Sequence, residues 1–150
     1  MTLDIQRAQV RDLEAVAALF DAYRSFYGKA PDLPLATAFI RERLGRQDSV
    51  ILLARGGDDA ALGFTQLYPS FSSVGCTRIL VLNDLFVAAS GRGAGIGRAL
   101  LEAARSHARQ SGAARLVLET AADNYLAQAL YESFGFERES GFLTYSMSVA

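Results

Sequence analysis

An apolar strand that runs through a glycine-rich turn directly into a helix constrains this chain more than any other feature. The segment 84–87 ends an apolar run, and Arg-Gly-Ala-Gly-Ile-Gly-Arg occupies positions 92–98. The first turn of a helix leaves backbone N–H groups without acceptors, and the helix dipole adds partial positive charge at the same place. Glycines at 93, 95 and 97 remove side chains that would keep an anion at a distance. The segment therefore predicts a phosphate-binding turn made of main chain.

The spacing of the glycines excludes two common nucleotide motifs. The dinucleotide fingerprint starting at Gly93 would require glycine at position 98, which is Arg98. The P-loop requires Lys and then Ser or Thr after its second glycine, whereas Gly97 is followed by Arg98 and Ala99. The pattern that fits is Arg-x-x-Gly-x-Gly, at Arg92, Gly95 and Gly97.

This pattern strongly resembles the pyrophosphate-binding segment of the acetyl-coenzyme A-dependent N-acetyltransferases, the GNAT family. The lead-in 82–87 and the follow-on 97–101 resemble the same family. A later segment adds to the resemblance, because an Asn opens a predicted helix that ends in Tyr-x-x-x-Gly-Phe, with Asn124, Ala127, Ala129, Leu130, Tyr131, Phe134, Gly135 and Phe136 as the matching residues. The two motifs stand in the family's order, and the resemblance covers nearly the whole chain. It is closest to family members that act on polyamines, basic protein tails or small amines.

Composition narrows the function classes. The 150 residues suit one domain over 1–150, and 51% hydrophobic residues indicate a globular chain. A formal net charge of −1 argues against a dedicated nucleic-acid binder. Cys76 is the only cysteine, which excludes an internal disulfide, favours a reducing compartment and is most simply a small buried hydrophobe. Without an apolar signal segment or a run long enough to span a membrane, we expect a cytoplasmic protein.

Hydrophobic periodicity predicts an α/β domain with a mixed sheet flanked by helices, in the order βααβββαβαβ. The expected elements cover residues 3–8, 13–23, 35–44, 49–54, 61–68, 78–87, 96–110, 115–120, 123–134 and 142–149, with a further short strand possible at 136–138. The strand 78–87 is apolar at both parities, so it should be central. We expect residues 69–75 to form a polar loop.

Acetyl transfer to an amine needs a held thioester, a neutral amine and a destination for the thiolate. An alkyl amine has a pKa of about 10.4, so neutralising it at pH 7 costs roughly 4–5 kcal/mol. The thiol that leaves has a pKa of only about 8.5, so protonating the thiolate is the smaller demand. Direct attack by the amine requires no protein nucleophile.

The resemblance implies a set of cofactor contacts for acetyl-coenzyme A. Backbone N–H groups of the turn should face its diphosphate, and the main chain of the preceding strand should pair with its pantetheine amides. The residues concerned are Leu85, Phe86, Val87, Arg92, Gly93, Ala94, Gly95, Ile96, Gly97 and Arg98. Both arginines are equally compatible with solvated side chains. No metal site is predicted.

The helix 123–134 is expected to contribute one face to the same cofactor. Asn124, Ala127, Gln128 and Tyr131 share that face, and Asn124 and Tyr131 lie about 10 Å apart along the axis. In the resemblance, Asn124 contacts the pantetheine arm and the Tyr131 hydroxyl is the general acid near the sulfur. Ala127, on the same face, is also expected to bind the cofactor. An isolated tyrosine of this kind could equally be half buried with its hydroxyl in water.

The residue that takes the proton from the amine is the least determined part of the site. Polyamine acetyltransferases of the family carry Glu then Asp before the glycine turn, where this chain has Asn83 and Asp84. The candidates are Asp84, Glu119 on the next strand, or a water relay near Tyr68. Asp84 could equally accept hydrogen bonds from backbone N–H groups. His107, the only histidine, is expected to pack behind the turn rather than to act in catalysis.

Aromatic residues predict the acceptor site. Tyr23, Phe26 and Tyr27 end the first helix, Tyr68 and Phe71 flank the predicted loop, and Asn83 precedes Asp84. In the family such regions wall the acceptor, although each residue singly could belong to the core or a loop. We expect an N-acetyltransferase that acts on a primary amine of a small molecule or peptide, as a homodimer. The alternatives are a non-catalytic acyl-coenzyme A sensor and a transferase for protein N-termini or aminoglycosides.

Overall fold

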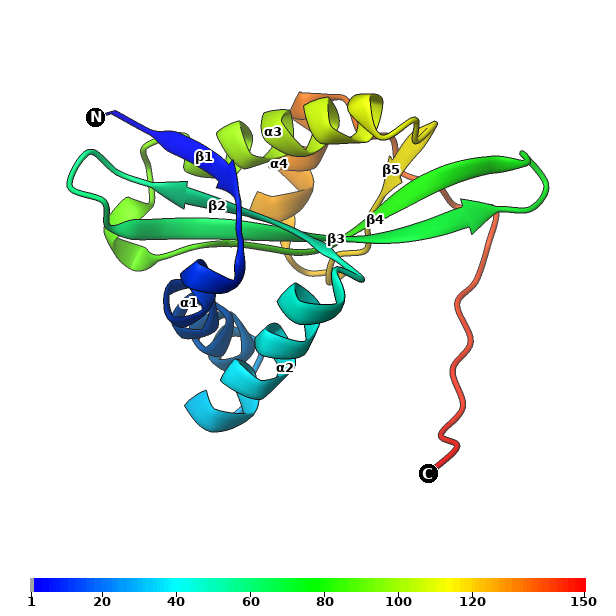
Figure 1. Cartoon of the computed structure of the whole chain (residues 1–150). Coiled ribbons are helices and arrows are strands. Elements are labelled where there is room, and N and C mark those ends of the chain that lie inside the picture. Colours follow the sequence, from blue (N-terminus) through cyan, green and yellow to red (C-terminus); the bar gives the residue numbers. More distant parts are fainter. Residues whose placement is uncertain (1) are drawn as a thin grey trace. The chain divides into compact units, whose positions relative to one another are not determined.

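The computed structural model describes residues 2–150 and divides into two compact parts, one up to Glu119 and one from Thr120 onward (Figure 1). The first contains the sheet and three α-helices, and the second contains one α-helix followed by an extended segment.

The sheet of the first part has five strands in the order β1-β2-β3-β4-β5. The strands are β1 Asp4–Arg7, β2 Val50–Arg55, β3 Ala61–Ser72, β4 Thr77–Val87 and β5 Arg115–Val117. The first four pair antiparallel and β5 pairs parallel to β4, so the sheet is mixed as predicted. β4 lies between β3 and the short edge strand β5, so the strand at the centre of the sheet is β3 and not β4 as expected.

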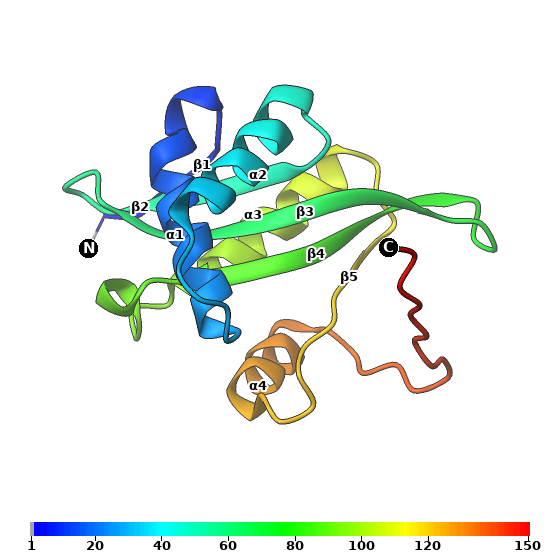
Figure 2. The ribbon, with the colours of Figure 1, turned by 90° about the horizontal axis from the view of Figure 1, so that it is seen from below.

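Helices cover both faces of this sheet. The pair α1 Leu13–Phe26 and α2 Leu33–Arg46 lies on one face, and α3 Ile96–Gln110 lies on the other (Figures 1 and 2). Short 3-10 turns, η1 Val10–Asp12 and η2 Ala89–Gly91, precede α1 and α3. Asp32 caps α2 by accepting a hydrogen bond from the Leu35 N–H, and Pro34 fits into the first turn of this helix, which therefore begins earlier than expected.

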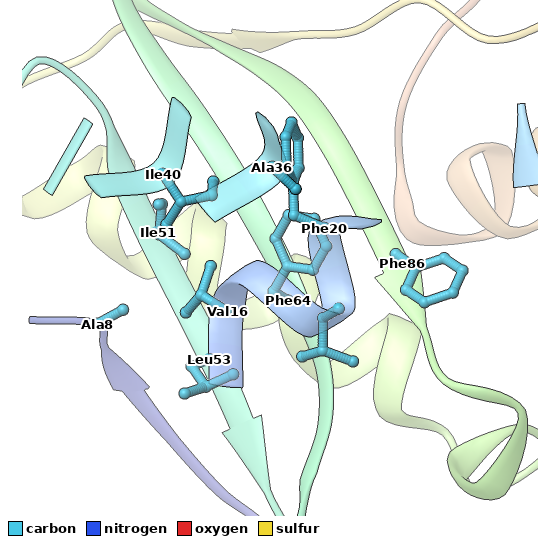
Figure 3. Close-up of a cluster of buried hydrophobic side chains, with 10 residues drawn as sticks. Ala8, Val16, Phe20, Ala36, Ile40, Ile51, Leu53, Phe64 and Phe86 are labelled. Atoms are coloured by element: carbon cyan, nitrogen blue, oxygen red, sulfur yellow. The ribbon is translucent and has the colours of Figure 1, made fainter. Parts of the chain in front are cut away.

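The core on the α1–α2 face is built from aliphatic and aromatic side chains of both layers. Phe20 packs edge-on against Phe64, with ring centroids 6.3 Å apart, and the cluster extends from Ala8 to Phe86 (Figure 3). On the opposite face, α3 buries Ile96, Leu100, Leu101, Ala104 and Ala108. Close packing there explains Gly63, since a Cβ on this residue would lie 2.8 Å from the Phe86 carbonyl oxygen.

The β3–β4 hairpin is longer than predicted. Residues 69–72, expected in a polar loop, continue β3, and their ladder partners on β4 run back to Thr77. Phe71 on β3 and Thr77 and Ile79 on β4 are residue types that favour strands, and they lie in the part of the hairpin beyond the end of β2. The turn at the tip exposes Cys76, so the expectation of a buried cysteine is wrong.

The segment 142–149, expected as a closing strand, and the segment 136–138 contain no strand in the structure. The alternation that suggested the closing strand is present, but the segment has no ladder partner and its apolar side chains are 82–91% exposed at Phe142, Leu143, Tyr145, Met147 and Val149. A strand requires a neighbouring strand to satisfy its backbone groups, which sequence alternation does not provide.

The second part is organised around α4 Tyr125–Phe134. The Asn124 side chain accepts a hydrogen bond from the Ala127 N–H at 3.2 Å and caps the helix, as the sequence indicated. Gly135 ends it with φ of 120°, a conformation that glycine adopts without strain. Leu126 on this helix is 87% exposed.

Candidate active site

The glycine turn leads from the end of β4 into α3. Gly95 is the N-cap of α3, with φ of 77°, and Gly93 has φ of 81°. Both values lie in the left-handed region, which favours glycine. No heavy atom lies within 4 Å of a Cβ built on either residue, so the turn presents an open surface of main chain.

Backbone donors at this turn are left for a ligand. The first hydrogen bond that α3 makes back to the turn joins the Ala99 N–H to the Gly95 carbonyl at 3.1 Å. Within residues 2–150, the N–H groups of residues 93–97 have no backbone acceptor. Such donors at the N-terminus of a long helix fit the diphosphate of coenzyme A.

The two arginines of the motif differ in their surroundings. The Arg92 Nε donates to the Val87 carbonyl at 3.1 Å, and its guanidinium lies 5.9 Å from the centre of the Phe86 ring. Arg92 therefore ties the turn to the end of β4. Arg98 lies exposed in the first turn of α3.

The β4 edge before the turn is open on one side. The strand pairs with β3 as far as Val87, whereas β5 pairs only with Ile79–Val81. In the part of the chain up to Glu119, the main chain of Leu85, Phe86 and Val87 therefore lacks a strand on the β5 side. An edge of this kind can accept an extended, amide-containing ligand as an added strand.

A β-bulge interrupts β4 at Asn83. Gln66 pairs with Asp84 and Leu67 pairs with Leu82, so Asn83 has no partner in the register. Because side chains alternate between faces, the extra residue places Asp84 on the α1–α2 face with Phe86, whereas Leu82 points to the other face. The Tyr23 hydroxyl donates to the Asn83 carbonyl at 3.3 Å.

Asp84 is a buried carboxylate, only 2% exposed. Its oxygens accept hydrogen bonds from the Gln66 Nε2 at 2.5 Å and the Asn83 Nδ2 at 2.9 Å. Burial raises the pKa of the Asp84 carboxyl, and the hydrogen bonds from Gln66, Asn83 and Tyr23 partly oppose that rise. A carboxyl whose pKa is raised toward neutrality is a better proton acceptor for an ammonium group.

Tyr68 lies beside this carboxyl on β3. Burial and the charge of Asp84 raise the pKa of the Tyr68 phenol to about 12. The phenol is therefore protonated at neutral pH.

Aromatic rings extend from the core to the surface near Asp84. The Tyr23 ring packs against Phe86 at 6.2 Å and against Tyr27 at 5.1 Å, and Tyr27 packs against Phe26 at 5.4 Å. Tyr27 and Phe26 are more than half exposed. Three of the predicted acceptor residues, Tyr23, Phe26 and Tyr27, therefore lie in contact with one another. Phe71 is not among them, since it is 73% exposed on the distal part of β3 and has no ring contact with this group.

Other predicted residues lie apart from this group or in the second part of the chain. Glu119 is exposed beyond the end of β5. Within residues 2–119, its side chain makes no hydrogen bond to Asp84, whose carboxylate accepts from Gln66 and Asn83. His107 is half-buried on α3, where burial and then the charge of Arg7 lower its pKa. In the second part, Tyr131 is partly buried on α4 and its ring packs against Phe136 at 5.8 Å.

Sequence reasoning missed the partners of Asp84. Gln66 is fully buried, and its Oε1 accepts a hydrogen bond from the Ser49 hydroxyl at 2.9 Å. The available signal was a glutamine within the apolar run 61–68, directly on the strand that pairs with β4. Recognising it required the register of the two strands, which the bulge shifts.

Comparison with known proteins agrees with this geometry. The model of the acetyltransferase (GNAT) family matches residues 15–136. An "Uncharacterized N-acetyltransferase YhfO" from Bacillus subtilis (strain 168) is 46% identical over 147 residues, which are 98% of each chain. A crystal structure of a probable acetyltransferase superposes with a TM-score of 0.91 at 39% identity and covers 98% of both chains.

A more distant structure shares the fold. AAC(6')-Iy, solved in complex with the bisubstrate analog CoA-S-monomethyl-acetylneamine, has a TM-score of 0.82 at 22% identity, with 99% of both chains covered. No helix within residues 2–150 combines the length and the apolar character needed to cross a membrane. The relatives do not favour the acyl-coenzyme A sensor as an alternative. The chain therefore belongs to the GNAT family and is an acetyl-CoA-dependent N-acetyltransferase.

Proposed function

We propose that this enzyme acetylates a primary amine of a small cationic molecule or peptide, with Asp84 as the group that receives the proton of the amine. One observation carries the proposal: a buried carboxylate lies on the strand that leads into the glycine turn, beside a row of aromatic rings that reaches the surface. A negative charge next to aromatic faces favours a cationic ligand.

The glycine turn and the β4 edge would hold the cofactor. The N–H groups of residues 93–97 would bind the diphosphate, and the open main chain of Leu85–Val87 would pair with the pantetheine amides. The family motif that contains Asn124 and Ala127 supports a role for both residues in binding the same cofactor. Bound acetyl-CoA supplies a thioester whose acetyl carbon is open to attack.

The chain's own residues then manage protons. The amine nitrogen forms a bond to the acetyl carbon as the carbon–sulfur bond breaks, the amine loses a proton and the thiolate gains one. Asp84 is buried, so the proton would reach it through Tyr23, whose hydroxyl would accept the proton of the amine as it passes its own proton, now donated to the Asn83 carbonyl, to the Asp84 carboxyl. Tyr131 would donate the proton to the thiolate, a role that rests on the family motif around it.

A homodimer and a cytoplasmic location complete the proposal. Support for a second copy comes from the segment 142–149, where Leu143, Tyr145, Met147 and Val149 alternate with polar residues and are at least 82% exposed. An uncharged segment of this pattern is prone to pair with another strand. The free Cys76 thiol is consistent with a reducing compartment.

The direct test is an assay of free thiol with acetyl-CoA and a panel of amines, namely polyamines, small alkyl amines, aminoglycosides and peptides with free N-termini. We expect thiol release that depends on a cationic amine, and a rate at least about a hundredfold lower in Asp84→Asn. Calorimetry with CoA should give equal affinity for both proteins. CoA binding without thiol release from any amine would instead favour a sensor, and full activity of Asp84→Asn would exclude Asp84 as the base.

A further inference from the structure

The buried polar side chains of this protein are gathered in one place. Among residues 2–150 they are Ser49, Thr65, Gln66 and Asp84, each at most 6% exposed. Three hydrogen bonds join these four residues, and each leads to Asp84 directly or through Gln66. The rest of the core around them is apolar.

Three of these residues form a line across the sheet on the α1–α2 face. The Ser49 hydroxyl, just before β2, donates to the Gln66 Oε1 on β3 at 2.9 Å, and the Gln66 Nε2 donates to the Asp84 carboxylate on β4 at 2.5 Å. An ionised carboxylate only accepts hydrogen bonds, so it requires the amide nitrogen of Gln66 to face it. The Oε1 then faces Ser49, whose hydroxyl supplies the matching donor.

Packing alone does not explain this arrangement. Polar groups in an apolar core are costly unless their hydrogen bonds are complete, and apolar residues of similar volume would avoid that cost. Thr65 lies on the opposite face of β3 and donates to the Asp84 main-chain carbonyl at 2.7 Å, so it does not touch the carboxylate. Of the buried polar residues, only Ser49 and Gln66 therefore form a line of hydrogen bonds that ends on the carboxylate of Asp84.

We propose that Ser49 and Gln66 are positioning residues that hold the Asp84 carboxylate in its ionised, proton-accepting form and in a fixed orientation beside Tyr23. This inference rests on the proposed function of Asp84 as the base. Gln66 acts directly on the carboxylate, and Ser49 acts through Gln66 by fixing the direction of its amide.

Four further titratable groups lie near the Asp84 carboxyl and bear on its pH dependence. Tyr23 from α1 and Tyr68 from β3 face it, and Arg43 of α2 and Asp48 lie beyond Tyr68. The Gln66 hydrogen bond lowers the pKa of the Asp84 carboxyl against the effect of burial. Its loss should therefore raise that pKa, so the base becomes protonated at a higher pH.

The experiment compares Gln66→Met and Ser49→Ala with the wild type. Two readouts apply: the acid limb of the kcat/KM profile with any accepted amine, and titration of ¹³C-labelled aspartate carboxyls by NMR, with Asp84 assigned through Asp84→Asn. In Gln66→Met we expect both to move to higher pH by about one unit. Ser49→Ala should shift them less in the same direction, and Ser49→Thr, which keeps the hydroxyl, should restore them.

Thr65→Val is the matched control, since it removes a buried hydroxyl next to Gln66 without touching the carboxylate. It should lower thermal stability and leave the Asp84 titration unchanged. An Asp84 titration that is the same in wild type, Gln66→Met and Ser49→Ala overturns the proposal, and Ser49→Ala decides the matter if Gln66→Met does not fold. The NMR readout needs no acceptor, so a failure of the proposed amine chemistry remains distinguishable from a failure of this inference.

Discussion

The Tyr23 hydroxyl donates to the main-chain carbonyl of Asn83, at the residue that the β3–β4 register skips. The bulge at this residue turns Asp84 toward the same helix, so one tyrosine of α1 touches both the irregular strand and the carboxylate. The Tyr23 hydroxyl lies 3.3 Å from the Asn83 carbonyl oxygen and also contacts the Asp84 carboxyl. Because Tyr23 is partly exposed, its hydroxyl connects the buried carboxylate with the surface.

Tyr23→Phe should remove this connection while the ring packing is kept. The loss of one hydrogen bond in the transition state corresponds to about 1 kcal/mol, or about a fivefold lower kcat. Steady-state kinetics would measure it, with Tyr125→Phe, an exposed tyrosine of α4, as the control. An unchanged kcat in Tyr23→Phe would remove this hydroxyl from the proton route.

Asp84→Asn should change stability in a direction that depends on pH. Because the pKa of the Asp84 carboxyl is raised in the folded state, the folded protein binds more protons than the unfolded chain between the two pKa values. The free energy of unfolding therefore falls as pH rises through the raised pKa. The variant should lack this dependence and be at least as stable as the wild type at pH 8. Its hydrogen bonds can stay complete, because the Gln66 amide can turn so that its oxygen accepts from the new side-chain amide at position 84. The Gln66 amide nitrogen then donates to the Ser49 hydroxyl oxygen.

Urea unfolding of both proteins from about pH 4 to pH 8 would measure the effect. A difference in unfolding free energy between them that stays constant with pH would contradict a raised pKa for this carboxyl.

Gly95→Val should disable the phosphate-binding turn. Gly95 has φ of 77°, where a β-branched residue is strained, and the added side chain would cover the open N–H groups. We expect at least about a tenfold weaker affinity for CoA by calorimetry. Gly45→Ala, on α2 with open space around it, is the control and should bind CoA as the wild type does. Equal affinity in Gly95→Val would refute the assignment of the turn.

The sequence predicts the glycine turn more accurately than it predicts the acceptor side, for physical reasons. The turn and α3 depend on local signals, namely glycines that allow positive φ and apolar residues at helical spacing, and α3 begins and ends where expected. The environment of Asp84 depends on a register shift between β3 and β4 that no local pattern encodes. The same holds for residues 69–72, whose strand conformation comes from pairing across a long hairpin.

Tyr131→Phe should separate chemistry from binding. The partly buried Tyr131 ring packs against Phe136, and phenylalanine would keep that contact. If the hydroxyl protonates the thiolate, kcat should fall by about a hundredfold while the affinity for CoA changes less than about threefold. Stopped-flow kinetics and calorimetry on the same preparation would measure both. Equal turnover in the variant would remove Tyr131 from the mechanism.

The exposed segment 142–149 offers a test of the proposed homodimer. Leu143, Tyr145, Met147 and Val149 share one parity, so a charge placed among them should oppose pairing with a second copy, whereas a charge at Ser146 should point the other way. We expect Tyr145→Glu to shift the protein toward monomer in analytical ultracentrifugation and Ser146→Glu to behave as the wild type does. Because burying an unpaired carboxylate in an apolar contact costs several kcal/mol, the dissociation constant should rise by at least about a hundredfold. A wild type that is monomeric at every concentration would exclude the dimer, and equal dissociation of the two variants would exclude this face as its interface.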